Sequence, residues 1–162
     1  MPPRAKPGEG IVVVLDVGPG VRAGTDTTFF AQSKKCLINI LQRKMYAEKC
    51  RDMVGLVLCG SNETDNALAT DNQYRNIKLL QPPLTVTWDI INRVENISGG
   101  RESGDWLDAL VVAMDLLHDP DGIRFSNKRI ILMTDFSGEF SDDQTTQIIA
   151  GLKNHEIELS VM

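Results

Sequence analysis

A run of five apolar residues at 11–15, three of them adjacent valines, constrains the fold of this chain more than any other feature. An uninterrupted run of this kind is typical of a strand buried on both faces, as in the middle of a parallel sheet. Asp16 ends the run, and Gly18-Pro19-Gly20 predicts a turn that takes the chain off the sheet. Because open α/β folds bind ligands at the carboxyl ends of their central strands, Asp16 is the first candidate binding residue.

The rest of the sequence alternates between strand patterns and helix patterns. Apolar runs predict further strands at 53–60, 76–80, 129–135 and 156–162. Helical spacing predicts helices at 28–48, 87–97 and 105–118, and Ser141 is expected to cap a fourth. The strand at 76–80 is expected at an edge of the sheet, ended by Pro82-Pro83. Strands that alternate with helices predict a mainly parallel sheet covered on both faces.

The composition fits one globular domain. The chain has 162 residues, of which 42% are hydrophobic and 24% charged. We expect a flexible tail at 1–9 and a single domain at 10–162, which we interpret as a fragment of a longer protein because 156–162 resembles a strand without a cap. No apolar run approaches the roughly 18–20 residues of a membrane helix. A net charge of -5 argues against a main nucleic-acid grip, which needs a basic surface.

A second apolar run, at 130–133, leads to Asp135, so we expect Asp16 and Asp135 to face the same rim of the sheet. The order of elements and these two acids resemble the von Willebrand factor A family. The resemblance implies a doubly wound α/β fold, with a mainly parallel sheet, helices on both faces and one antiparallel edge strand. In that family a metal ion is held at this rim by Asp-x-Ser-x-Ser, a loop threonine and a later strand-end aspartate.

The metal ligands of that family are incomplete in this sequence. Gly18 and Gly20 stand where the two serines should be. Mg²⁺ prefers six oxygen ligands at about 2.1 Å, and glycine offers no side-chain oxygen. We therefore expect a degenerate site at Asp16, Gly18, Gly20 and Asp135 that holds no metal and whose acids bond loop amides. A Mg²⁺-dependent adhesion domain is the alternative.

No pattern in the sequence indicates catalysis or a cofactor. The phosphate-binding motif Gly-x-x-x-x-Gly-Lys is absent, so phosphate transfer at Asp16 has no support. His118 and His155 have no nucleophile partner visible in the sequence, and surface histidines are the ordinary explanation. The three cysteines have no metal-binding spacing and indicate reduced thiols in a cytosolic or nuclear protein.

The helix at 105–118 carries an acidic and apolar side. Asp105 and Asp108 lie there, and Val111 reaches the same side three residues later. One interpretation is a pocket for a peptide with basic residues and one large apolar anchor, where charge steers and the anchor supplies affinity. The other interpretation is a solvated face whose acids favour the positive end of the helix dipole.

Two further residues outside this helix bear on the pocket. Leu68 and Tyr74 are large side chains in a polar insertion, where they either form one wall of the pocket or tuck inward as loop anchors. Met114 shares the helical spacing of Leu107, Leu110 and Leu117, which predicts that it faces the sheet.

Several stretches resemble one family more closely than the general A-domain pattern does. They are Leu15-Asp16-Val17-Gly18, Gln42-Arg43-Lys44, Leu56-Val57-Leu58-Cys59-Gly60, Thr64-Asp65-Asn66, Gln73-Tyr74 and Leu107-Asp108-Ala109-Leu110. Together they resemble the amino-terminal A domain of the large subunit of the Ku family, of vertebrate type, over essentially the whole chain. The resemblance implies a nuclear, non-catalytic domain that takes part in DNA double-strand-break repair by non-homologous end joining.

The resemblance also implies partners. The whole Ku protein pairs with a small Ku subunit, encircles DNA ends mainly through regions outside this fragment, and recruits the DNA-dependent protein kinase catalytic subunit. The A domain of its large subunit docks short basic-hydrophobic Ku-binding motifs of end-joining factors such as APLF and XLF, and no membrane is involved. On this basis the expected peptide contacts are Leu68, Tyr74, Asp105, Asp108, Val111 and Met114.

Overall fold

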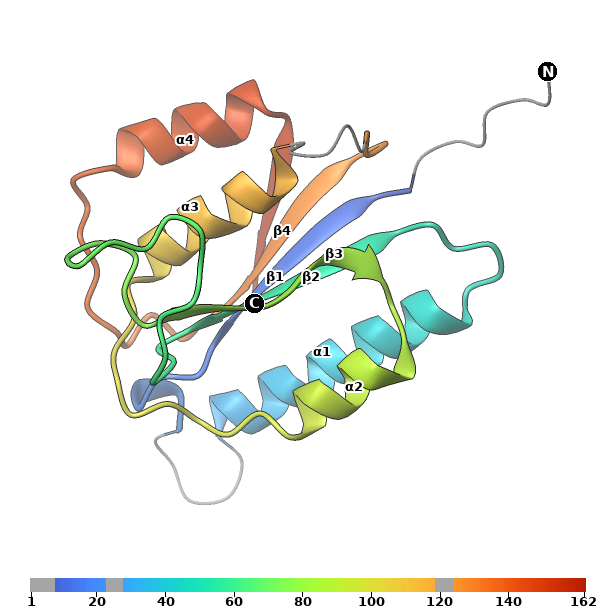
Figure 1. Ribbon diagram of the computed structural model, residues 1–162, viewed down its shortest axis with the longest axis horizontal. Coiled ribbons are helices and arrows are strands. Elements are labelled where there is room, and N and C mark those ends of the chain that lie inside the picture. The colour runs from blue at the N-terminus through green and yellow to red at the C-terminus, as the bar shows by residue number, and fades with distance from the viewer. Residues whose placement is uncertain (1–7, 23–27, 119–123) are drawn as a thin grey trace.

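The computed structural model describes residues 8–22, 28–118 and 124–162, which build a five-stranded sheet (Figure 1). In the spatial order β3-β2-β1-β4-β5, the strands are β1 (Gly10–Asp16), β2 (Met53–Cys59), β3 (Ile77–Thr85), β4 (Lys128–Met133) and β5 (Ile157–Val161). All pair in parallel except β3, which is antiparallel to β2 at one edge. The predicted α/β class with one antiparallel edge strand is confirmed. Most of the predicted tail, residues 1–7, lies outside the described residues.

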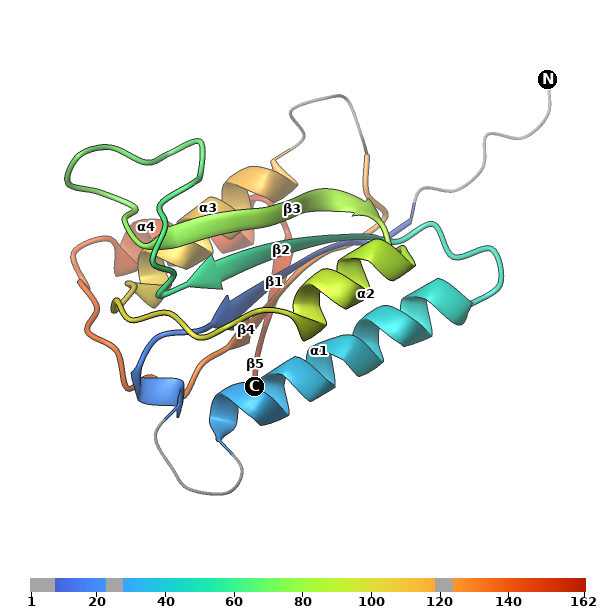
Figure 2. The same ribbon diagram turned by 60° about the horizontal axis from the view of Figure 1, so that its bottom comes forward.

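Within the described residues, two α-helices cover each face of the sheet (Figures 1 and 2). They are α1 (Phe29–Tyr46) and α2 (Trp88–Glu95) on one face, and α3 (Trp106–Leu117) and α4 (Thr145–Asn154) on the other. A short 3-10 helix, η1 (Gly20–Arg22), follows the turn after β1.

The central strand β1 contributes to both hydrophobic cores, and all seven of its residues are buried. Ile11, Val13 and Leu15 pack into the core under α1 and α2. Val12 and Val14 pack into the core under α3 and α4. Each fully buried side chain of this kind contributes about 1.5–3 kcal/mol, so a polar residue inside the run would weaken one core or the other.

The edge strand β3 runs through Pro82 and Pro83 to Thr85, so the predicted end of this strand at the two prolines is wrong. A proline removes one N–H donor, which an edge strand tolerates at an irregular position. The β2–β3 register shifts on both sides of Leu56. Gly55 lies opposite, where a Cβ would come within 3.2 Å of Pro83, so the bare glycine leaves room for the ring.

Helix α4 begins later than predicted. It starts at Thr145 with Gln144 as its N-cap residue, so the prediction that Ser141 caps it is wrong. The N–H of Ser141 instead donates to Asp105 Oδ2 at 2.7 Å, and its hydroxyl donates to Asp143 at 3.1 Å. These bonds hold Ser141 beside the start of α3, and the chain turns into α4 only after it has left this contact.

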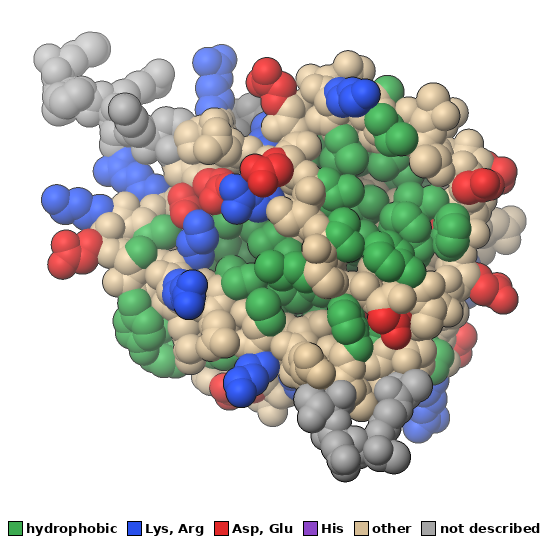
Figure 3. All heavy atoms as spheres, turned by 180° about the vertical axis from the view of Figure 1, so that it is seen from behind, with side chains coloured by type: hydrophobic (Ala, Val, Ile, Leu, Met, Phe, Trp, Pro, Cys, Tyr) green, Lys and Arg blue, Asp and Glu red, His purple; other side chains and the backbone are tan. Residues whose placement is uncertain are grey.

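The far edge of the sheet, at β5, carries exposed apolar side chains. Leu159 and Val161 of β5 and Ile149 of α4 are exposed. Figure 3 shows the broad area of apolar side chains on this side of the molecule. No described helix is both long enough and apolar enough to cross a membrane.

A buried glutamine supports the irregular edge beside the prolines. The Gln81 Nε2 group donates to the Val54 carbonyl at 3.1 Å, and the Gln81 side chain is buried. We expect Gln81→Leu to lower the free energy of unfolding by about 1–3 kcal/mol, because a buried carbonyl loses a donor. Thermal and urea unfolding measure the change. Gln147→Leu on exposed α4 is the matched control, and equal stability of both variants would show that the Gln81 bond contributes nothing.

Candidate functional site

The carboxyl ends of β1 and β4 meet at one rim of the sheet. Asp16 is buried there, where it accepts the N–H of Gly18 at 2.9 Å and the hydroxyl of Thr134 at 2.7 Å. Asp135 is exposed and accepts both the N–H, at 2.9 Å, and the hydroxyl of Ser137. Both acids therefore bond loop amides. The sequence pattern gave no signal that Thr134 would be the direct partner of Asp16.

Burial raises the pKa of Asp16 above its ordinary value. The hydrogen bonds from Thr134 and Gly18 oppose this shift, and the nearby charge of Asp135 adds to it. The net direction is upward, so the surroundings of Asp16 disfavour its ionised form. To hold a divalent cation, this rim would need further oxygen ligands around the Asp16 carboxylate.

The donor set at this rim does not fit Mg²⁺. Gly18 and Gly20 bring no side-chain oxygen, and a Cβ at Gly20 would lie 1.9 Å from Ser137 Oγ. Ser137 thus fills the space that a side chain at position 20 would need. A hollow of about 280 Å³ remains beside these residues. Among the described residues, no three His, Cys, Asp or Glu side chains gather as candidate metal ligands.

The acidic face predicted on α3 begins at its N-cap, Asp105. Asp105 Oδ1 accepts the N–H groups of Leu107 at 2.8 Å and Asp108 at 3.4 Å, while Oδ2 accepts that of Ser141. Asp105 therefore provides an acceptor for free N–H groups in the first turn of the helix, as the helix-dipole interpretation expects. It also ties the connection after β4 to α3, and so it has a structural role whether or not a ligand binds.

The polar insertion before β3 is a loop closed by Asn66. The Asn66 amide donates to the carbonyls of Tyr74 at 3.0 Å and Ile77 at 2.9 Å, and its oxygen accepts the N–H of Leu68 at 3.1 Å. Tyr74 has a φ of 55°, in the left-handed region that bulky residues rarely adopt. Asn66 thus fixes the backbone at Leu68 and Tyr74, the two predicted contacts of this loop. Its sequence motif alone did not reveal this role.

The loop and α3 meet at Asp108. Its carboxylate accepts the N–H of Tyr74 at 3.3 Å. Burial and the charge of Asp105 raise the pKa of Asp108, against the Tyr74 bond, which lowers it. Burial and the charge of Asp108 likewise raise the pKa of Tyr74.

All six predicted contact residues are half-buried. Leu68, Tyr74, Val111 and Met114 pack against the core under α3, and each keeps part of its side chain accessible. A Cβ at Gly151 of α4 would lie 2.4 Å from Met114 Cε, which places Met114 between the two helices. The structure thus joins the loop and α3 through Asp108 and the shared core, with Met114 toward α4.

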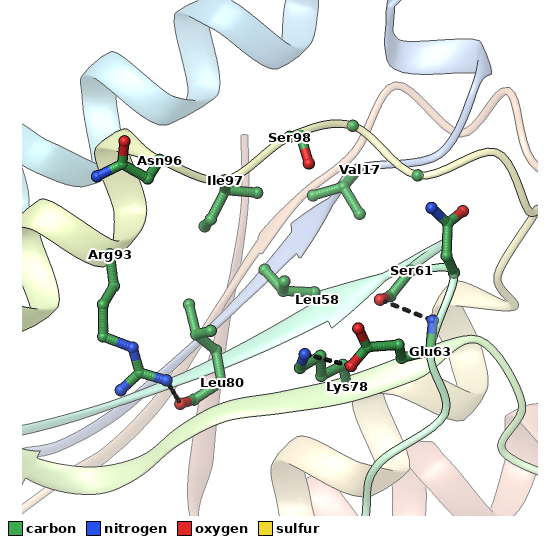
Figure 4. Close-up of a pocket in the computed structure, with 13 residues that line it drawn as sticks. Val17, Leu58, Ser61, Glu63, Lys78, Leu80, Arg93, Asn96, Ile97 and Ser98 are labelled. Atoms are coloured by element: carbon green, nitrogen blue, oxygen red, sulfur yellow. Dashed lines mark hydrogen bonds and ion pairs between the residues drawn. The ribbon is translucent and has the colours of Figure 1, made fainter.

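A separate hollow of about 340 Å³ lies on the α2 side, at the ends of β2 and β3 (Figure 4). Leu58 forms part of its apolar floor. Its two cations already have partners, because Arg93 donates to the Leu80 carbonyl at 2.6 Å and Lys78 pairs with Glu63. We therefore do not place the candidate site in this hollow.

Comparison with solved structures defines the class of the fold. The crystal structure of the SpRpn10 VWA domain matches with a TM-score of 0.65 and 13% identity, over 95% of this chain and 73% of that chain. BatB from Bacteroides thetaiotaomicron, a conserved hypothetical protein, matches with a TM-score of 0.65 and 15% identity, over 95% and 65%. At these identities the likeness shows the fold alone, which is that of a von Willebrand A domain.

Comparison of sequences places the chain within that class. The family profile described as the Ku70/Ku80 N-terminal alpha/beta domain matches residues 10–162. X-ray repair cross-complementing protein 5 of Xenopus laevis is 38% identical, over 92% of this chain and 21% of its own length. The KU80 subunit of ATP-dependent DNA helicase 2 from Arabidopsis thaliana is 35% identical, over 86% and 21%. The chain belongs to the Ku family, and it spans about a fifth of the length of these relatives.

The raised pKa of Asp16 predicts a pH-dependent effect of Asp16→Asn. Ionised Asp16 destabilises the folded state, and this penalty grows as pH rises from about 3.8, the ordinary value, through the raised pKa. We expect Asp16→Asn to be more stable than the wild type near neutral pH and equally stable below the ordinary pKa. An asparagine keeps an acceptor for Gly18 and brings a donor for Thr134. Thermal unfolding across this pH range measures the difference, with exposed Asp89→Asn as the control. A loss of stability at every pH would contradict it.

Proposed function

We propose that this chain is the peptide-docking domain of the larger subunit of a nuclear Ku heterodimer that acts in DNA double-strand-break repair by non-homologous end joining. Family membership and relatives named as repair and KU80 proteins support this context. The whole Ku protein pairs with a small Ku subunit and recruits the DNA-dependent protein kinase catalytic subunit, and it contacts DNA ends mainly through regions outside these 162 residues. The net charge of -5 fits that division, because a main DNA-binding surface is basic.

The observation that carries the docking proposal is the junction of the loop with α3. The Asp108 carboxylate accepts the N–H of Tyr74, and Asp105 lies one helical turn before it. The half-buried side chains of Leu68, Tyr74 and Val111 pack against the same core. The complementary ligand is a short motif in which basic residues flank a bulky apolar side chain, as in the Ku-binding motifs of APLF and XLF. The acids attract the basic residues, and the apolar anchor supplies most of the affinity. A short peptide covers less area than a standard protein interface, so we expect modest affinity.

Preorganisation supports this site further. Asn66 holds the loop through three hydrogen bonds, and Asp105 holds the start of α3. A ligand that binds a surface already fixed in this way loses less free energy to ordering the protein. The partly buried carboxylate of Asp108 is also less screened by water than a fully exposed acid, so its attraction for a cation is stronger.

The proposal contains no catalytic step and no cofactor. Some relatives have names that include ATP-dependent DNA helicase. This sequence has no Gly-x-x-x-x-Gly-Lys phosphate loop. The composition of the rim argues against the alternative of a Mg²⁺-dependent adhesion domain. Gly18 and Gly20 offer no side-chain oxygen as a ligand, and Ser137 occupies the space at position 20.

Replacing Leu68, which would contact the apolar anchor of the peptide, should weaken binding strongly. We expect Leu68→Arg to weaken binding of a synthetic APLF Ku-binding-motif peptide by more than about tenfold, because loss of this apolar contact costs about 1.5–3 kcal/mol. Isothermal titration calorimetry measures the affinity, and circular dichroism verifies the fold. Leu84→Arg, at the opposite end of β3 and 51% exposed, is the matched control. Unchanged affinity in Leu68→Arg would refute the assignment. Loss of wild-type binding in EDTA would instead favour the metal-dependent alternative.

Removing one acidic charge should weaken binding and its salt dependence together. We expect Asp108→Asn to lower peptide affinity by about 2–10-fold, because a partly buried charge pair is worth somewhat more than an exposed one. The asparagine oxygen can still accept the Tyr74 N–H, so the loop should stay in place. Affinity measured at several salt concentrations should fall less steeply than for the wild type. Asp89→Asn on α2 is the control, and identical salt slopes for Asp108→Asn and the wild type would contradict the prediction.

A further inference from the structure

An aromatic cluster lies at the amino-terminal end of α3. The ring of Trp106 packs against Phe136 and Phe140, in the connection after β4, with ring centroids 5.1 Å and 5.2 Å apart. The indole N–H of Trp106 is buried without an acceptor among the described residues, so ring packing rather than hydrogen bonding holds the cluster. Phe136 and Phe140 remain 46% and 53% exposed, which leaves two aromatic side chains open to a ligand.

The connection holds one of these rings, that of Phe136, on a strained backbone. Phe136 has a φ of 58°, and a bulky residue in this region costs of order 1–3 kcal/mol. Its N–H donates to Thr134 Oγ1 at 3.1 Å, and further along the connection Ser141 is held by Asp105. Strain that the surrounding bonds maintain is common at ligand sites. Aromatic rings fixed in advance also lose little entropy when a partner binds.

Acidic residues accompany the aromatic rings. Glu139, Asp142 and Asp143 lie in the same connection and are exposed. None of the ion pairs formed between described residues involves them. An apolar surface with unpaired acids beside it complements a segment in which Lys or Arg flanks a large apolar side chain. Such a cation can also lie over a phenylalanine ring.

We propose that this rim patch, defined as Trp106, Phe136, Glu139, Phe140 and Asp142, is a second anchoring subsite for the docked peptide. It takes a large apolar side chain and a basic neighbour of that side chain. The inference rests on the proposed function, because it extends the path of the same peptide from the α3 face to the rim.

Asp105 brings the α3 face and the rim connection together. Asp105 and Asp108 lie three residues apart, so their side chains share one side of the helix. Asp105 Oδ2 accepts the N–H of Ser141 at 2.7 Å, and Ser141 lies between Phe140 and Asp142 in the chain. Asp105, one of the two acids of the first subsite, is therefore in direct contact with the segment that carries the rim patch. An extended peptide advances about 3.3 Å per residue, so its two apolar anchors should be separated by only a few residues.

Photo-crosslinking tests whether the peptide reaches the rim. p-Benzoylphenylalanine replaces Phe140 in the 162-residue chain, which is irradiated with the synthetic APLF Ku-binding-motif peptide. With a labelled form of this peptide, we expect a covalent adduct between the peptide and the chain. An excess of unlabelled peptide should prevent its formation by competition. The same photoreactive residue at Trp88, which is 54% exposed on the other face of the sheet, should give none. Equal adducts at the two positions, or none at position 140 while the peptide binds, would overturn the rim subsite.

Calorimetry separates this inference from the proposed function. We expect Phe140→Ser to weaken peptide binding by about 3–10-fold, and Asp142→Lys, which leaves the rings packed, to weaken it in the same direction. If Leu68→Arg abolishes binding while both rim variants bind like the wild type, the rim subsite is wrong and the proposed function stands. If the wild-type chain does not bind the peptide at all, both are wrong.

Discussion

Burial of β1 on both faces is the constraint on which the rest of the domain depends. Its alternate residues fill the two cores, so helices must cover both sides and neighbouring strands must flank it. The strand can become polar only where it leaves the sheet, at Asp16. The same rule holds for β4, which leaves the sheet at Thr134 and Asp135. Close packing of the centre thus brings the polar residues of this rim together.

At this rim, hydrogen bonds within the protein satisfy both acids. Thr134 and the Gly18 amide satisfy the oxygens of Asp16, and Ser137 satisfies Asp135. Glycine at position 20 then has a packing reason, because the hydroxyl of Ser137 occupies the space of its missing side chain. The rim becomes a support for the connection after β4.

Features set by neighbouring residues in the chain could be predicted from the sequence, and those set by distant contacts could not. The apolar runs of β1 and β2 indicated buried strands because burial leaves a direct mark on composition. The path of β3 through its prolines depends on Gly55, a residue of another strand. The start of α4 depends on Asp105, which is 36 residues away from Ser141.

The candidate site shows the same division. The acids of α3 were visible as a pattern, because helical spacing places them on one side. The hydrogen bonds of the Asn66 amide join residues of one loop, but they could be assigned only once the loop conformation was known. The cluster of Trp106 with Phe136 and Phe140 joins α3 to a connection some thirty residues later. Two phenylalanines close together in a polar segment were the available signal. The sequence does not show that they pack against Trp106.

Helix α3 gives the two proposed subsites a common support. Its inner side is fixed in the core by residues such as Leu110 and Leu117. At its start, the carboxylate of Asp105 caps the helix with one oxygen and holds the rim connection with the other. One turn later, Asp108 holds the loop through the N–H of Tyr74. Each of these acids therefore combines a structural bond with a negative charge that faces the proposed ligand. A substitution that removes the charge but keeps the acceptor separates these two roles, which is why asparagine at position 108 is more informative than alanine.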